Sequence, residues 1–143
     1  MRPQISGIVN CFNRGEVKCK SGNYTLLRQG GIVGTATGAS KISNCYSTGK
    51  ITGEAIGTDV NIGLAIGKAT AKSTVSNVYC VKQGNILAIA KSDTLMSVPV
   101  ESDMIKSETD MKTKEFVDLL NGQSGTAFVQ DVLNKNGGYP VLK

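Results

Sequence analysis

Short apolar segments recur at a nearly constant step along the first 91 residues. Residues 8–12 (Ile-Val-Asn-Cys-Phe) return as residues 42–46 (Ile-Ser-Asn-Cys-Tyr) and, in weaker form, as residues 75–79 (Val-Ser-Asn-Val-Tyr). A second landmark, residues 31–34 (Gly-Ile-Val-Gly), returns as residues 64–67 (Leu-Ala-Ile-Gly). Two separate landmarks that share a period of about 33 residues predict a repeat protein.

The segments within each repeat have the character of strands. They are about five residues long, rich in β-branched and aromatic residues, and separated by polar, glycine-rich turns. Residues 1–91 contain no long amphipathic run of the kind that a helical repeat needs. We therefore expect a mainly β fold, a short parallel β-solenoid of about three repeats over residues 1–91, with successive repeats stacked about 4.8 Å apart. Residues 86–89 (Ile-Leu-Ala-Ile) are a possible third copy of the second landmark, without its glycines.

Stacking of this kind places equivalent residues above one another. Asparagine tolerates a left-handed bend, and its amide can bond to the copies above and below it. The predicted amide ladder consists of Asn10, Asn44 and Asn77. An inward column of small apolar groups is expected from Cys11, Cys45 and Val78. An aromatic column on the outside is expected from Phe12, Tyr46 and Tyr79.

The pattern changes after residue 91. Residues 92–110 resemble an irregular connector, and a helix is predicted to start with Thr109 or Asp110 as its N-cap and to end near Asn121, before Gly122. Its apolar face is expected to hold Phe116, Leu119 and Leu120, with Val117 beside them. Residues 127–129 and 139–142 follow as short extended segments. We expect residues 92–143 to form a connector plus a C-terminal helix-and-strand cap that covers the exposed end of the solenoid.

Composition and charge limit the classes of partner that we expect this chain to bind. The net charge is +5, but the lysines are scattered and no nucleic-acid recognition motif accompanies them, so a nucleic-acid partner is not expected. No run of 18 apolar residues is present, and membrane insertion is not expected either.

Two phrases resemble a known repeat family. Residues 42–53 (Ile-Ser-Asn-Cys-Tyr-Ser-Thr-Gly-Lys-Ile-Thr-Gly) and residues 30–34 (Gly-Gly-Ile-Val-Gly) are similar to the GLUG-type repeat of bacterial cell-surface proteins, including IgA-protease-like proteins. The resemblance covers roughly residues 5–90, and residues 111–121 and 138–142 are similar to the segment that often closes such arrays. The third repeat departs from the pattern, since Val78 replaces the cysteine. The resemblance implies extracellular display and no catalytic residues.

Few residues in the sequence could support catalysis or bind a metal ion. The chain has no histidine, which excludes Ser–His and Cys–His nucleophile systems, and the acids Glu16, Glu54, Asp59 and Asp93 fall at unlike repeat positions. The four cysteines form no Cys-x-x-Cys pair, so no metal site and no cofactor are predicted. The cysteines are expected to be small buried hydrophobic residues, with a Cys11–Cys45 disulfide as the alternative.

These observations favour a non-enzymatic, extracellular repeat module that acts as a structural spacer or adhesive surface, joined to neighbouring domains of its parent chain. The alternative is an accessory module of a secreted protease or glycosidase that binds a host glycan or a host surface protein. In that case the binding surface is expected to be formed by exposed Tyr24, Tyr46 and Tyr79, with nearby lysines.

Overall fold

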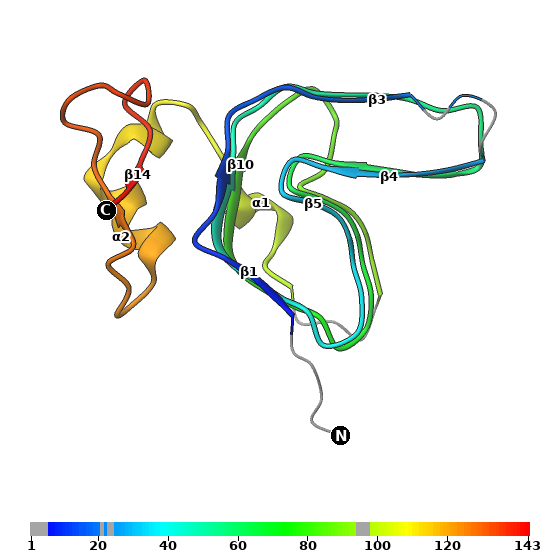
Figure 1. The fold of residues 1–143 in the computed structure, drawn as a ribbon, viewed down its shortest axis with the longest axis horizontal. Helices are drawn as coiled ribbons and strands as arrows, with labels where there is room; N and C mark the ends of the chain where they lie inside the picture. Colours follow the sequence, from blue (N-terminus) through cyan, green and yellow to red (C-terminus); the bar gives the residue numbers. More distant parts are fainter. Residues whose placement is uncertain (1–5, 21, 23–24, 94–97) are drawn as a thin grey trace.

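The chain follows nearly the same path three times before it enters a separate C-terminal segment (Figure 1). This computed structural model describes residues 6–20, 22, 25–93 and 98–143. Pass 1 contains β1 (Gly7–Val9), β2 (Phe12–Asn13), β3 (Val17–Lys20), β4 (Leu26–Gly30) and β5 (Val33–Ala36). Pass 2 contains β6 (Lys41–Ser47), β7 (Ile51–Glu54), β8 (Asp59–Gly63) and β9 (Ile66–Ala69). Pass 3 contains β10 (Thr74–Val81) and β11 (Ile89–Ser92).

Equivalent strands of successive passes pair in parallel. β6 lies between β1 and β10, with Ile8 opposite Ile42 and Ile42 opposite Val75. β2 also pairs with β6, β3 with β7, β4 with β8, and β9 with both β5 and β11. The prediction of a mainly β fold built from parallel strands is confirmed. The register aligns like residues, because each step of 33 or 34 residues returns the chain to the same position.

Pass 3 is shorter than the other two. β3 and β7 form one two-stranded layer and β4 and β8 another, and together they make an arm that extends away from the stack (Figure 1). Pass 3 has no strand in this arm among the described residues, so Ile89 pairs with Ile66 after only 23 residues. Residues 86–89 therefore do align with the second landmark, but not at the repeat period.

The interior of the three passes is a thin aliphatic core. It is filled by small and branched side chains, among them Ile42, Cys45, Ile66, Val78 and Ala88, and it receives Met104 from the C-terminal segment. Each pass contributes one residue to each column of the core, and small or branched side chains fill such a narrow interior. The packing of the core thus depends on the register that aligns the passes, and not on a few large residues.

The C-terminal segment makes two different contacts with the stack. α1 (Glu101–Met104) and β12 (Ile105–Lys106) adjoin pass 3, where β12 pairs in parallel with β10. The segment continues with the 3-10 helix η1 (Asp110–Lys112), α2 (Lys114–Asn121), β13 (Phe128–Val129) and β14 (Val141–Leu142). α2 packs against β6 and β10 from the side of the stack (Figure 1). The expectation that this helix would cover the end of the stack is wrong, since α1 and β12 lie at that end instead.

The start and the buried face of α2 also differ from the prediction. Thr113 is the N-cap, and its hydroxyl oxygen accepts a hydrogen bond from the Phe116 amide, whereas Thr109 and Asp110 belong to the preceding 3-10 turn. Leu119 is 50% exposed and Val117 is only 7% exposed. At 100° per residue, Phe116, Val117 and Leu120 share one face, and Leu119 lies well outside it. Gly122, with φ 71°, ends the helix as expected.

Candidate interaction surface

The two tyrosines of the aromatic column are buried, whereas Phe12, in the outermost pass, is 37% exposed. Phe12 stacks on Tyr46 with ring centroids 5.2 Å apart, and Tyr46 is opposite Tyr79 in the strand register. Tyr46 is fully buried and Tyr79 is 9% exposed, because α2 and the last residues of the chain lie over them. The prediction that Tyr46 and Tyr79 form an exposed binding surface is therefore wrong. Tyr24 lies outside the described residues.

Tyr46 anchors the C-terminal segment. Its hydroxyl donates a hydrogen bond to the Pro140 carbonyl oxygen at 2.6 Å and accepts one from the Asn136 side-chain amide at 2.9 Å. Its ring also contacts the rings of Phe116 and Phe128. Burial raises the pKa of the Tyr46 phenol, and the hydrogen bond from Asn136 offsets part of that rise. The sequence carried no sign of this contact, because the partners lie about 90 residues further along the chain and outside the repeat pattern.

The three asparagines lie in one row. The Asn44 side-chain nitrogen donates to the Asn10 side-chain oxygen at 3.3 Å, and Asn77 donates to Asn44 in the same way at 3.0 Å. All three have left-handed backbones, with φ of 57°, 54° and 50°. Asparagine is tolerated in this conformation, and the bend turns its amide along the stacking direction. The structure thus brings together Asn10, Asn44 and Asn77 as the repeat spacing predicts.

The cysteines divide into two pairs. Cys45 and Cys80 are buried, and Cys45 is opposite Val78. Burial raises the pKa of the Cys45 thiol to about 11 and that of Cys80 to about 12. Cys11 is exposed and Cys19 is half-buried, so the expectation of four buried cysteines is wrong for these two. Cys11 belongs to the outermost pass, and no described strand pairs with the outer edge of that pass.

We expect the two pairs to react at different rates with a thiol reagent. At pH 8 in native buffer, Cys11 should be alkylated by iodoacetamide much faster than Cys45 and Cys80, whose thiols are buried and resist ionisation. Peptide mass mapping after timed quenching gives the rate at each site. Complete labelling of all four cysteines in denaturant is the control. Equal native rates at Cys11 and Cys45 would contradict the stacking of pass 1 on pass 2.

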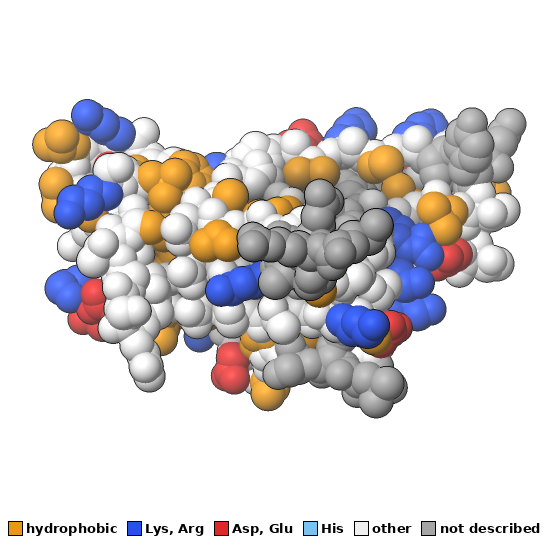
Figure 2. Space-filling model, turned by 60° about the horizontal axis from the view of Figure 1, so that its bottom comes forward, with side chains coloured by type: hydrophobic (Ala, Val, Ile, Leu, Met, Phe, Trp, Pro, Cys, Tyr) orange, Lys and Arg blue, Asp and Glu red, His pale blue; other side chains and the backbone are white. Residues whose placement is uncertain are grey.

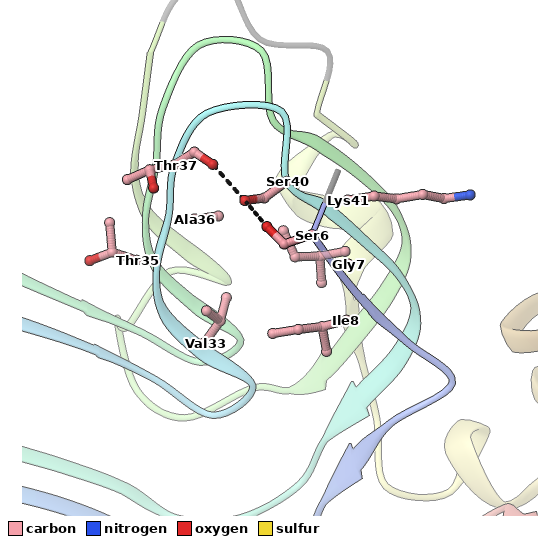
Figure 3. Close-up of a pocket in the computed structure, with 10 residues that line it drawn as sticks. Ser6, Gly7, Ile8, Val33, Thr35, Ala36, Thr37, Ser40 and Lys41 are labelled. Carbon is pink, nitrogen blue, oxygen red and sulfur yellow. Dashed lines mark hydrogen bonds between the residues drawn. The ribbon is translucent and has the colours of Figure 1, made fainter. Parts of the chain in front are cut away.

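The interior of the stack reaches the surface at pass 1. A cavity of about 280 Å³ is lined by segments of β1, β5 and β6 and the turn before β6: Ser6, Gly7, Ile8, Val33, Thr35, Ala36, Thr37, Ser40, Lys41 and Ile42. The side chains of Ile8 and Val33 point into the opening, whereas Lys41 points away from it (Figure 3). Ser40 donates to the Thr37 carbonyl oxygen at 2.5 Å and lies 3.5 Å from the Ser6 hydroxyl. We call this surface, formed by the outer edges of β1 to β5, the pass 1 face.

Unpaired backbone and apolar side chains meet on the pass 1 face. β1, β3, β4 and β5 each pair with a strand of pass 2, and no described strand pairs with their other edges. Of the exposed large apolar side chains, Val9, Phe12 and Leu26 belong to pass 1. Edges of this kind are templates for further strand pairing. The pass 1 face can therefore accept further strands.

The candidate carboxylates lie in separate contacts. Glu54 pairs with Lys20 at 3.5 Å, and Asp59 pairs with Arg28 at 2.6 Å. Asp93 accepts a hydrogen bond from the Ala71 amide at 2.7 Å, and Glu16 lies 3.5 Å from the Thr52 hydroxyl. Within the part of the chain that the structure describes, no three His, Cys, Asp or Glu side chains are grouped so that they could hold a metal ion. The absence of enzymatic activity stays a prediction.

Figure 2 shows how the charged side chains are distributed over one face of the molecule. Lysine and arginine side chains are distributed along the face shown in Figure 2, with acidic side chains among them. None of the described helices is long and apolar enough to cross a bilayer.

Comparison with known proteins identifies a family model that matches part of the chain. The model of the GLUG motif matches residues 30–52, which run from the end of β4 through β5 and β6 into β7. The resemblance seen in the sequence is thereby confirmed for this part of the chain. The curated proteins and the solved structures gave no match.

Proposed function

We propose that this chain is a non-catalytic spacer module of a bacterial surface protein, built as a three-pass parallel β-solenoid with a C-terminal cap. The observation that carries the proposal is the alignment of like residues in successive passes. Ile8, Ile42 and Val75 share one register, and the asparagines beside them form a hydrogen-bonded row. Such a stack can be lengthened by repetition without redesign of its core.

The two ends of the stack support this role in different ways. At pass 3, Met104 enters the core, and the Glu101 carboxylate accepts a hydrogen bond from the Ala88 amide at 2.6 Å. That end is therefore closed over part of its area by residues 98–106, which we propose to be the cap. The pass 1 face keeps its strand edges and its apolar opening. A module that is partly covered at one end and has unpaired strand edges at the other suits the end of an array.

The adhesive alternative loses two of its three expected residues. Tyr46 and Tyr79 form the contact between the stack and the C-terminal segment and are not accessible to a host glycan or protein. We therefore favour the spacer role. A glycan array and a host-matrix binding screen with the purified chain separate the two, since a saturable, specific ligand in either would favour the adhesive role.

Duplication of one pass tests the spacer proposal. A copy of residues 41–73 inserted between Ser6 and Gly7 has the length of one repeat and the register that pass 1 needs. We expect the added pass to pair with β1 and slow hydrogen exchange of the Gly7 and Val9 amides by at least about tenfold, because these amides point to the edge of β1 that is then paired. Exchange is measured by NMR at each amide.

The control is the same insertion with aspartate at the inserted copies of Ile42, Ile51 and Ile66. These side chains are buried in pass 2, and aspartate at the same positions cannot be buried without a large cost. The control insertion should leave exchange in β1 unchanged. Equal exchange in β1 for both insertions and the parent chain would contradict an extensible stack.

A further inference from the structure

One edge of β10 is only partly paired. Its first edge pairs with β6 from Thr74 to Cys80, whereas its second edge pairs with β12 only at Cys80 and Val81. Along Thr74–Tyr79 no described strand pairs with that second edge. A strand with one free edge presents half of its backbone donors and acceptors for pairing with another chain.

The free edge of β10 lines a groove. A cavity of about 320 Å³ is bounded by five consecutive residues, 75–79, together with Val98, Pro99, Asp103 and Met104. Successive residues of a strand face opposite sides, so a cavity that touches all five lies along the edge and not on one face. Apolar residues stand on both sides of the lining, with Val98 and Met104 in the C-terminal segment and Val75 and Val78 in β10.

A second hollow continues the groove on the outer side of β10. It measures about 670 Å³, shares Asn77 with the first, and is lined by Glu115, Asp118, Leu119, Gly122 and Gln123 of the α2 region. Leu119 is half exposed here, although it belongs to an otherwise well-packed helix. A strand added along β10 would therefore find space for side chains on both of its faces.

The rim of the groove is acidic in a chain of net charge +5. Asp103 lines the inner cavity, and Glu115 and Asp118 line the outer one. Asp118 pairs with Lys114 at 2.7 Å, whereas Asp103 and Glu115 have no ion-pair partner among the described residues. Lys106 lies over the Tyr79 ring at the far end, where β12 begins. The charge at the middle of the groove thus favours a positively charged occupant.

We propose that this groove binds a short extended peptide of net positive charge, which adds to β10 as a parallel strand. The peptide would carry an aliphatic residue at the level of Val75, as β6 does with Ile42, and asparagine at the level of Asn77. The Asn77 side-chain oxygen accepts no hydrogen bond from any described residue, so it can receive an amide donor as Asn10 and Asn44 do. The peptide strand ends before the level of Cys80, because Ile105 already pairs with β10 at that position.

The chain itself supplies a probe. Residues 37–45, with serine in place of Cys45 and with blocked ends, contain the lysine, isoleucine and asparagine that face Thr74, Val75 and Asn77 when β6 pairs with β10. Added to the intact protein, this peptide should slow hydrogen exchange at amides within residues 74–78. The β1 amides of the pass 1 face serve as the internal comparison. Absence of protection in β10, or protection only at Gly7–Val9, would overturn the proposal.

Reversing the charge of the acidic residues tests whether the peptide binds in this groove. In the variant Asp103→Lys with Glu115→Lys, we expect the affinity for the peptide to fall about tenfold or more. The matched control is Glu16→Lys with Glu54→Lys, which makes the same charge change on the arm, where both side chains are exposed. The control should bind as the parent does. Equal weakening in both variants would show that only net charge matters and would overturn the assignment to β10.

A peptide with alanine in place of its asparagine tests the register. We expect weaker binding with protection still confined to residues 74–78, because one amide hydrogen bond is lost while the strand pairing remains. Unchanged affinity would overturn the predicted alignment with Asn77.

Discussion

Replacing Tyr46 with alanine is expected to destabilise the protein by about 3–5 kcal/mol, the range typical of large aromatic-to-alanine changes in a core. The side chain is fully buried, and its ring contacts Phe12, Phe116, Phe128 and Tyr139. Its hydroxyl also holds the Pro140 carbonyl and the Asn136 amide. Since total stabilities are about 5–15 kcal/mol, the variant should lose a large part of its stability in urea denaturation.

Tyr46→Phe separates packing from hydrogen bonding. We expect a cost of about 1–3 kcal/mol, because the ring stays while the Pro140 carbonyl loses a buried donor. A further control is Val132→Ala, on a side chain that is 81% exposed, which should change stability by less than about 0.5 kcal/mol. If Tyr46→Ala were no more harmful than Val132→Ala, the C-terminal segment would not pack on the stack as described.

Replacing Gly30 with alanine is expected to cost about 3 kcal/mol or more. A β-carbon at this position would lie 2.6 Å from the Ala65 carbonyl oxygen and 2.9 Å from the Gly67 amide nitrogen, and it would also meet the Val33 carbonyl oxygen. All three obstacles are backbone atoms, so the clash is relieved only if β4 or the turn of pass 2 moves. Thermal denaturation followed by circular dichroism measures the loss.

Gly15→Ala is the matched control. A β-carbon there would meet only the Asn13 side-chain oxygen, at 3.4 Å, which is ordinary contact. We expect a change within about 0.5 kcal/mol. A similar loss of stability at both glycines would argue against the close approach of pass 1 and pass 2 at Gly30.

Most of the fold could be predicted from the repeat period. Because Asn10, Asn44 and Asn77 recur at the repeat period, their stacking, the parallel pairing and the column at Cys45 and Val78 follow from the sequence. In a stack each contact is between equivalent residues, so periodicity encodes contact directly. The family match lies within the same region, at residues 30–52.

The contacts that the period does not encode could not be predicted. The burial of Tyr46 and Tyr79 depends on α2 and on residues near Pro140, which are not part of any repeat. The predicted buried face of α2 was wrong in part. The spacing of Phe116 and Leu119 fits an amphipathic helix as well as the spacing of Phe116 and Val117 does. Only packing against the neighbouring strands selects which face is buried. The exposure of Cys11 likewise reflects its place in the outermost pass and not its residue type.

The most direct test of the stacked arrangement is a set of nuclear Overhauser contacts between equivalent residues. In a ¹⁵N-edited experiment, the side-chain amide protons of Asn44 should show cross-peaks to Asn10, and those of Asn77 to Asn44, as should backbone amides of β6 to β1 and β10. Absence of these contacts, together with cross-strand contacts of an antiparallel pattern, would contradict the account.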